Sequence, residues 1–229
     1  LLRIDRLIQS NYSKKLALFL LLSWSVYLIA YFPGVLSFDT SFQLVQFFGN
    51  PSHGIFPMTD NSLFTDHHPI FTTFIMGSVI KLMHCIFSYN LSLWFLCFLI
   101  AFVQASLFAW QLSLLSSIVD NRRLLTLLYL FYCAFPAFAY FCCVPCKDII
   151  FCICLIGFLN IWISMYVKTP TLNTFILFFL FALLCALSKK TTVYVFVLIC
   201  IMLLFTHVPA KHGVLASLIS VICIVQVLI

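Results

Sequence analysis

The chain has 229 residues and a net charge of +6, with 64% hydrophobic and only 8% charged residues. This composition excludes a soluble domain, because so few polar residues cannot cover the apolar surface of a chain of this length. Runs of about 17–25 apolar residues follow one another, each long enough to cross a hydrocarbon core of roughly 30 Å. The runs lack the alternation of barrel strands, so we predict an all-α, polytopic transmembrane helical bundle in the cell membrane.

The basic residues lie mostly in pairs at the ends of these apolar runs, at 14–15, 122–123 and 189–190. This is the ordinary flanking pattern of membrane spans, so the positive charge does not indicate a nucleic-acid partner. Most of the eleven cysteines lie inside apolar runs. Cysteine behaves there as a small hydrophobic residue, and we interpret these residues as structural rather than metal-binding.

The first span is predicted at 16–32, with basic residues before it on the cytoplasmic side. A long polar loop at 33–69 is then expected outside the cell. Further spans are predicted at 91–117, 124–143, 149–167, 171–187, 191–206 and 213–229. The chain begins with Leu1, and its last apolar run reaches Ile229 without a polar flank. We therefore expect the N-terminal part of a longer chain, with more helices in a C-terminal part.

Segment 70–87 is long enough to cross the membrane, but it carries Lys81 near its middle. A lysine inside the hydrocarbon is costly, so we prefer an interfacial helix on the outer leaflet and keep a crossing helix as the alternative. Without a crossing, slightly more basic residues lie on the cytoplasmic side. The same arrangement also places the polar residues at 39, 66, 147–148 and 189–190 on one face.

The loop at 33–69 holds three of the chain's six acidic residues and three of its six histidines, and it has no Lys or Arg. Membrane packing gives no reason to place these groups there, so the loop predicts a site. Asp39 can act as a general base on a hydroxyl group. It can equally cap a short interfacial helix that ends before Gly49, and the two roles are compatible.

The string Asp66-His67-His68-Pro69 is the second element of the predicted site. Its carboxylate and imidazoles can bind a divalent metal ion, or they can hydrogen-bond a sugar and a phosphate. The alternative is a polar start for a helix that Pro69 opens.

Two lysine-containing strings, Lys147-Asp148 and Lys189-Lys190, fall on the predicted outer face. A lysine there can bind a phosphate, or it can extend its ammonium to the membrane interface without further function. Gln43, one helical turn from Gln46, can bind sugar hydroxyls or face water.

Three strings resemble the GT-C superfamily of polytopic membrane glycosyltransferases, which includes protein mannosyltransferases and aminoarabinose lipid A transferases. They are YFPG…SFDTSFQLVQFFG after the first span, FTDHHPIFTTFIMGSVIKL before the next helix, and KD between later spans. The likeness is closest to uncharacterised Gram-positive bacterial members with a PG…D…Q…HHP loop. Asp39 matches the first-loop acid of the family, 66–69 matches its second string, and Asp148 matches an acid that often follows a later span.

The resemblance implies a GT-C-like fold and transfer of a sugar from a polyprenyl-phosphate-linked donor to an extracytoplasmic hydroxyl of a cell-envelope glycan, lipid or protein. Asp39, as general base, and Asp66 would be the catalytic carboxylates. The phosphate would be stabilised by lysines or by a divalent metal ion near Asp66, His67 and His68. The substrate-binding residues would be Gln43, His67, His68, Lys147, Asp148, Lys189 and Lys190. Membrane lipids would surround the spans.

A polytopic transporter or flippase for a lipid-linked saccharide, without covalent chemistry, is the competing hypothesis. Transporters often place charges near the bilayer midplane on broken helices. Apart from Lys81, no charged residue falls in the middle of a predicted span. The sequence therefore favours the transferase.

Overall fold

The structure is a computed structural model that describes residues 13–49, 68–205 and 211–228. Within these ranges it is helical, without strands, which confirms the all-helical prediction. The helices are α2 (Ser13–Ala30), α3 (Phe38–Phe48), α4 (Ile70–His84), α5 (Tyr89–Leu115), α6 (Arg122–Ala134), α7 (Pro136–Cys142), α8 (Lys147–Val167), α9 (Leu172–Ser188), α10 (Thr192–Phe205) and α11 (Lys211–Leu228).

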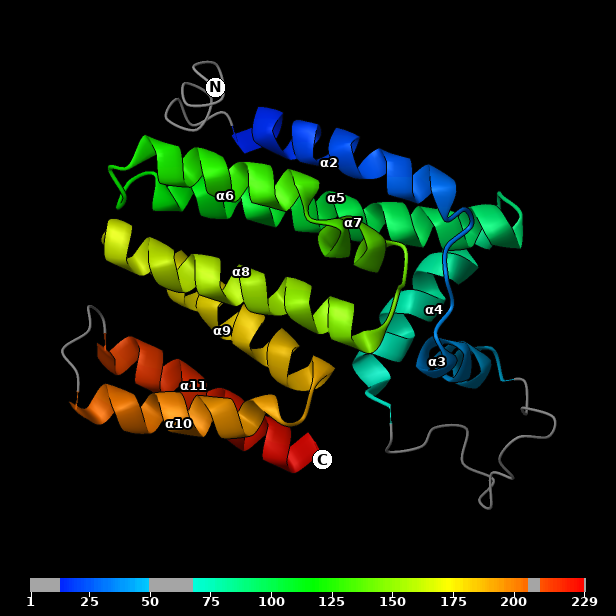
Figure 1. The fold of residues 1–229 in the computed structure, drawn as a ribbon. Coiled ribbons are helices and arrows are strands. Elements are labelled where there is room, and N and C mark those ends of the chain that lie inside the picture. Colours follow the sequence, from blue (N-terminus) through cyan, green and yellow to red (C-terminus); the bar gives the residue numbers. More distant parts are fainter. Residues whose placement is uncertain (1–12, 50–67, 206–210, 229) are drawn as a thin grey trace.

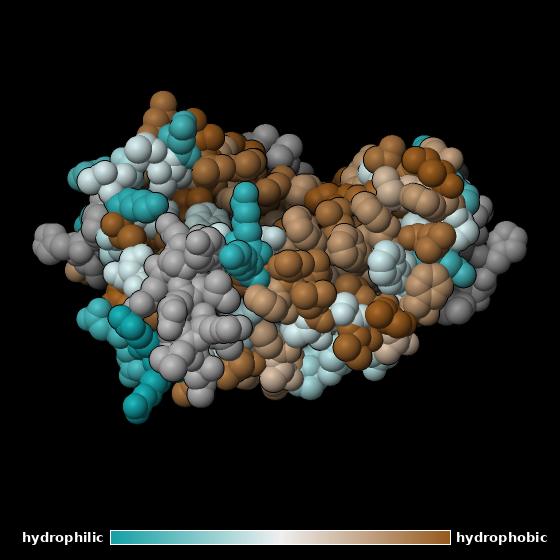
Figure 2. Space-filling view, turned by 90° about the horizontal axis from the view of Figure 1, so that it is seen from above, coloured by the Kyte–Doolittle hydropathy of each residue, from teal (hydrophilic) through white to brown (hydrophobic). Residues whose placement is uncertain are grey.

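Three helices, α2, α5 and α8, are long and apolar enough to cross a membrane. The bent pair α6 and α7 makes a fourth if it is counted as one span. The expected spans at 171–187, 191–206 and 213–229 correspond to α9, α10 and α11, which are shorter apolar helices over the part described. Figure 2 shows a broad apolar surface over the middle of one face, with hydrophilic side chains mostly toward its ends.

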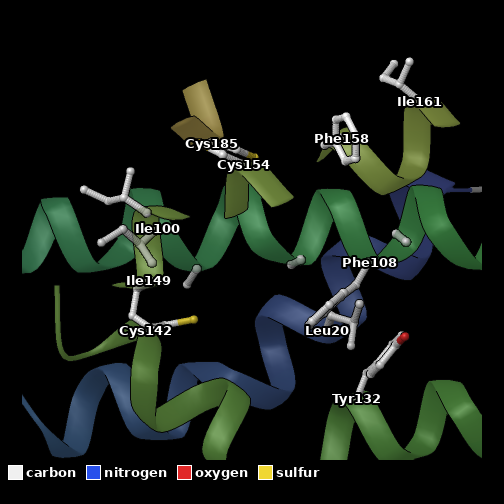
Figure 3. Close-up of a cluster of buried hydrophobic side chains, with 14 of the residues drawn as sticks. Leu20, Ile100, Phe108, Tyr132, Cys142, Ile149, Cys154, Phe158, Ile161 and Cys185 are labelled. Carbon is white, nitrogen blue, oxygen red and sulfur yellow. The ribbon is translucent and has the colours of Figure 1, made fainter. Parts of the chain in front are cut away.

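The long helices lie side by side around α5, which packs against α2 and α8, while α9 joins α8 to α10 and α11 (Figure 1). Their core is apolar and rich in aromatic rings. Phe108 of α5 stacks on Tyr132 of α6 with ring centroids 4.3 Å apart, next to Leu20 of α2 (Figure 3). This packing supplies the rigid frame for the residues at the helix ends.

The segment predicted as a span at 124–143 contains a break that the sequence analysis did not predict, because the chain forms α6 and α7 there with a bend of 46°. Pro136 has no N–H to donate to the carbonyl of Tyr132, four residues earlier. The indole Nε1 of Trp24 donates to that carbonyl instead, at 3.0 Å. A backbone carbonyl at membrane depth needs such a partner, and Trp24 is fully buried.

Two short helices lie at one end of the bundle, where α3 packs on α4 and α4 runs obliquely to the long helices (Figure 1). Gly77 of α4 allows this contact, because a Cβ there would overlap the ring of Phe47. Lys81 is exposed. Helix α4 is one of the shorter apolar helices, and the interfacial position that we expected for 70–87 stays a prediction.

Candidate functional site

Five segments from distant parts of the chain meet at this end of the bundle (Figure 1). They are the turn at 31–37, helix α3, the start of α4 with the residues before it, the start of α8, and the turn at 189–191 between α9 and α10. Most of the residues that the sequence singled out lie on these segments. The structure therefore brings them to one end of the molecule.

Asp39 lies in the first turn of α3, but it does not cap this helix. The N-cap is Ser37, whose hydroxyl accepts the N–H of Thr40 at 3.2 Å, and the helix ends at Gly49 with φ of 68°. The prediction that Asp39 caps this helix is therefore wrong, whereas the predicted end of the helix before Gly49 is correct. The carboxylate is available for other contacts, and its side chain is 42% exposed.

The turn before α3 is fastened to the segment that leads into α8. The hydroxyl of Thr40 donates to the carbonyl of Pro145 at 2.6 Å, and the N–H of Val35 donates to the carbonyl of Cys143 at 2.8 Å. Gly34 has φ of 126°, and a Cβ there would lie 2.8 Å from Sγ of Cys97. Only glycine fits that position easily, so the approach of α3 to α8 depends on it.

Lys147 connects three of these segments. Its Nζ lies 2.8 Å from Oδ2 of Asp39 on α3, and 3.4 Å from Nδ1 of His68, which precedes α4. Asp39 and His68, which the sequence analysis predicted as site residues, thus contact the same ammonium group. His68 is only 7% exposed, whereas the side chain of Lys147 is 21% exposed and remains accessible.

The neighbouring residue, Asp148, binds a different partner. Its Oδ1 lies 2.9 Å from Nζ of Lys189, which also lies 5.6 Å from the ring centroid of Phe151. The hydrogen bond that Lys189 donates to Asp148 raises the pKa of Lys189, although partial burial of the ammonium opposes that shift. Both side chains of this pair are about half exposed, so the pair contributes little to stability, about 0–1 kcal/mol.

A pocket of about 200 Å³ opens beside these ion pairs. Its volume equals that of about six or seven water molecules at ~30 Å³ each, which is enough for a small anion. The lining residues are Pro69, Lys147, Asp148, Ser188, Lys189, Lys190 and Thr191. Three lysines, one aspartate and two hydroxyls line the pocket, and Asp39 pairs with Lys147 beside it. The positive charge still exceeds the negative charge, which suits a phosphate.

Gln43 lies deeper than the sequence suggested. Its side chain is fully buried between α3 and α4, where its Nε2 donates to the hydroxyls of Thr72 and Thr73. Its Oε1 has no hydrogen-bond partner in the part of the chain that the structure describes. Direct contact with a sugar therefore does not fit this position. The threonine pair escaped the sequence analysis, because nothing in FTTF marks it as buried.

The predicted metal ligands are only partly visible. Asp66 and His67 lie outside the described residues, whereas Nδ1 of His68 faces the ammonium of Lys147. Within 13–49, 68–205 and 211–228, no three His, Cys, Asp or Glu side chains are grouped to hold one. The metal ion stays a prediction.

The cysteines are all free thiols. Cys97, Cys142 and Cys143 are buried close to the turn that fastens α3. This agrees with our interpretation of cysteine as a packing residue in the bundle.

Comparisons with protein-family models, with curated proteins and with solved structures found no match to this chain.

Proposed function

We propose that this chain is a membrane glycosyltransferase that moves a sugar from a polyprenyl-phosphate-linked donor to an extracytoplasmic hydroxyl group. One observation carries the proposal. A partly exposed carboxylate, Asp39, lies 2.8 Å from Lys147, which also lines a lysine-rich pocket at the end of an apolar bundle. A base and an anion site therefore lie next to each other, which suits transfer from a phosphate to a hydroxyl.

In the proposed reaction the donor phosphate occupies the pocket beside Lys147 and Lys190. Asp39 accepts the proton of the acceptor hydroxyl as its oxygen bonds to the anomeric carbon. The bond from that carbon to the phosphate oxygen breaks, and the electron pair leaves with the polyprenyl phosphate. Negative charge grows on the phosphate oxygen, where the ammonium groups stabilise it.

An apolar stripe on α10 suits the lipid tail of the donor. Tyr194, Leu198 and Met202 recur every four residues and are exposed by 73%, 62% and 68%. The stripe begins three residues after Thr191, which lines the pocket. A polyprenyl chain along α10 would therefore place its phosphate at the lysines while its tail stays in the hydrocarbon.

The charge distribution supports an extracytoplasmic site. The end of the bundle opposite the pocket carries most of the described basic residues (Figure 1), namely Lys14, Lys15, Arg122, Arg123, Lys168 and Lys211. Basic flanks favour the cytoplasmic side, so the pocket and Asp39 would face outward.

One observation favours the second candidate, a transporter or flippase for a lipid-linked saccharide. The break between α6 and α7 resembles the discontinuous helices that transporters use near the midplane. The charged residues argue against it, since Asp39, Lys147, Asp148 and Lys189 lie at helix starts and ends. We therefore prefer the transferase.

A single assay separates the two. Purified protein in liposomes is given radiolabelled polyprenyl-phosphate sugars and cell-envelope fractions as acceptors. The transferase moves label covalently into the acceptor and releases polyprenyl phosphate. A flippase moves the intact donor between leaflets and forms no labelled product, and that outcome would replace our proposal.

The positive charge beside the phosphate has two possible sources, the lysines or a divalent metal ion at Asp66, His67 and His68. The described contacts favour the lysines, because Lys147 already neutralises Asp39 and faces His68. Transfer should then persist after exhaustive chelation. A metal ion requires neutral imidazoles, so transfer that is lost on chelation, restored by added ion and weakened at low pH would assign the role to the metal.

A further inference from the structure

We propose that Gln43 is a positioning residue, which acts through Thr72 and Thr73 to hold the turn of His68 and Pro69 against Lys147. The catalytic consequence of this role rests on the proposed function. The positioning itself does not, because it follows from hydrogen bonds between α3 and α4. It can therefore be tested without any substrate.

The first step of the argument is the environment of Gln43. Its side chain is 0% exposed, and its Nε2 donates to the hydroxyl of Thr72 at 3.0 Å and to that of Thr73 at 2.9 Å. Both amide hydrogens are thereby used inside the interface. A residue in this position acts on its neighbours in the protein rather than on a ligand.

The second step leads from the threonines to the site. Thr72 and Thr73 donate their hydroxyls to the carbonyl of Pro69 at 3.0 and 3.1 Å, and the N–H of Thr73 reaches the same oxygen at 3.2 Å. Three hydrogen bonds therefore fix this peptide at the start of α4. Pro69 lines the pocket, and the preceding residue, His68, contacts Lys147.

The third step is the spacing along α3. Gln43 follows Asp39 by four residues, so both lie on the same side of the helix. Asp39 binds Lys147 directly, whereas Gln43 reaches it through α4 and His68. Helix α3 thus holds Asp39 directly, and it holds His68 indirectly through Gln43 and α4. These are the two side chains that contact Lys147.

A side chain that only filled the space between α3 and α4 would be better apolar. The buried Oε1 of Gln43 has no partner within the described ranges, and burying such an atom is unfavourable. Methionine has a similar size and buries no polar atom. The amide is useful here for the two bonds that it donates.

The test follows the ring resonance of His68 at one pH, in histidine-labelled protein in nanodiscs, with His68→Gln as the assignment. Gln43→Met should shift this resonance. Gln111→Met is the matched control, since it removes an inter-helix bond to Tyr132 far from the site and should leave the resonance unchanged. An unshifted resonance in Gln43→Met, or equal shifts in both variants, would overturn the proposal.

Coupling to Lys147 separates positioning from general loosening. In a Lys147→Gln background, at least about half of the shift caused by Gln43→Met should disappear, because coupled residues are not additive. Fully additive shifts would contradict the role. Should Gln43→Met fail to fold, Thr73→Val and Thr73→Ser give the same comparison. Valine should shift His68, whereas serine keeps the hydroxyl and should restore the wild-type resonance.

Sugar transfer supplies the second readout. Gln43→Met should lower kcat/KM about tenfold by misplacing the groups around the donor, and Thr73→Ser should retain it. A shifted His68 resonance in a protein without transfer activity would leave the positioning intact and reject the proposed function. If the enzyme transfers sugar but Gln43→Met leaves the His68 resonance unshifted, the proposed function stands and the positioning role of Gln43 is rejected.

Discussion

The two ends of the bundle carry their charges in different ways. At the end where α2 and α6 begin, six described basic residues accompany one described carboxylate, Asp120. At the other end, Lys147 and Lys189 each lie within 3 Å of a carboxylate from a different segment, at 2.8 and 2.9 Å. Flanking charge requires no such geometry. In the function that we propose, the first end orients the protein in the membrane and the second end carries the reaction.

The largest expected effect is the opposite labelling of the two ends. Single cysteines at positions 122 and 148, with the native cysteines replaced, should react with an impermeant maleimide from opposite sides of the membrane. Position 148 should label from outside, because basic flanking residues favour the cytoplasmic side and position 122 belongs to the basic end. Labelling of both positions from one side would show that the two ends of the bundle do not lie on opposite sides of the membrane.

A cysteine at position 60, which lies outside the described residues, sharpens the same test. If α4 does not cross, positions 60 and 148 should label from the same side. Labelling from opposite sides would show that α4 crosses, and the loop at 33–69 would then be separated from the pocket.

A large loss of transfer is expected for Lys147→Gln. This change removes the positive charge that Asp39, His68 and the pocket share. Transfer should fall by about 10²–10³-fold, since a group that stabilises developing charge is lost. Lys168→Gln, at the opposite end and exposed, is the matched control and should leave transfer unchanged. Equal effects of the two variants would mean that the ends do not differ in function.

A smaller effect is expected in the frame between the ends. Trp24→Phe leaves the carbonyl of Tyr132 without its donor at the break before Pro136. The free energy of unfolding in detergent should fall by about 1–3 kcal/mol. Trp94→Phe is the control, because Trp94 donates to Leu28 in the last turn of α2, where interfacial water can replace it. A larger loss for Trp94→Phe would contradict our account of the break.

The sequence predicted the parts of the fold that depend on hydrophobic length and helix signals. Apolar runs place the helices within a few residues, and Gly49 marks the end of α3 as expected. The break at Pro136 was missed, because an apolar run of membrane length hides a proline whose cost is offset by a distant tryptophan. The effect of that proline depends on tertiary contacts.

The sequence predicted which residues belong to the candidate site, but it did not predict which of them contact each other. Unusual polar residues among apolar ones identified Asp39, His68, Lys147 and Lys189. Their partners depend on how the ends of separate helices meet, over 108 positions for Asp39 and Lys147. The inward direction of Gln43 was likewise invisible, since α3 is amphipathic and either face can turn to α4. Side-chain direction needs the packed structure.

The most direct test of the central claim, that Asp39 is the base of a transferase, compares Asp39→Asn with Asp120→Asn. Asparagine keeps the size of the side chain, and loss of a partly exposed ion pair costs only about 0–1 kcal/mol, so the protein should still fold and bind donor. We predict that Asp39→Asn lowers transfer by about 10³-fold or more, whereas Asp120→Asn, at the opposite end, retains it. Transfer near the wild-type rate in folded Asp39→Asn would remove Asp39 from the mechanism and contradict the account.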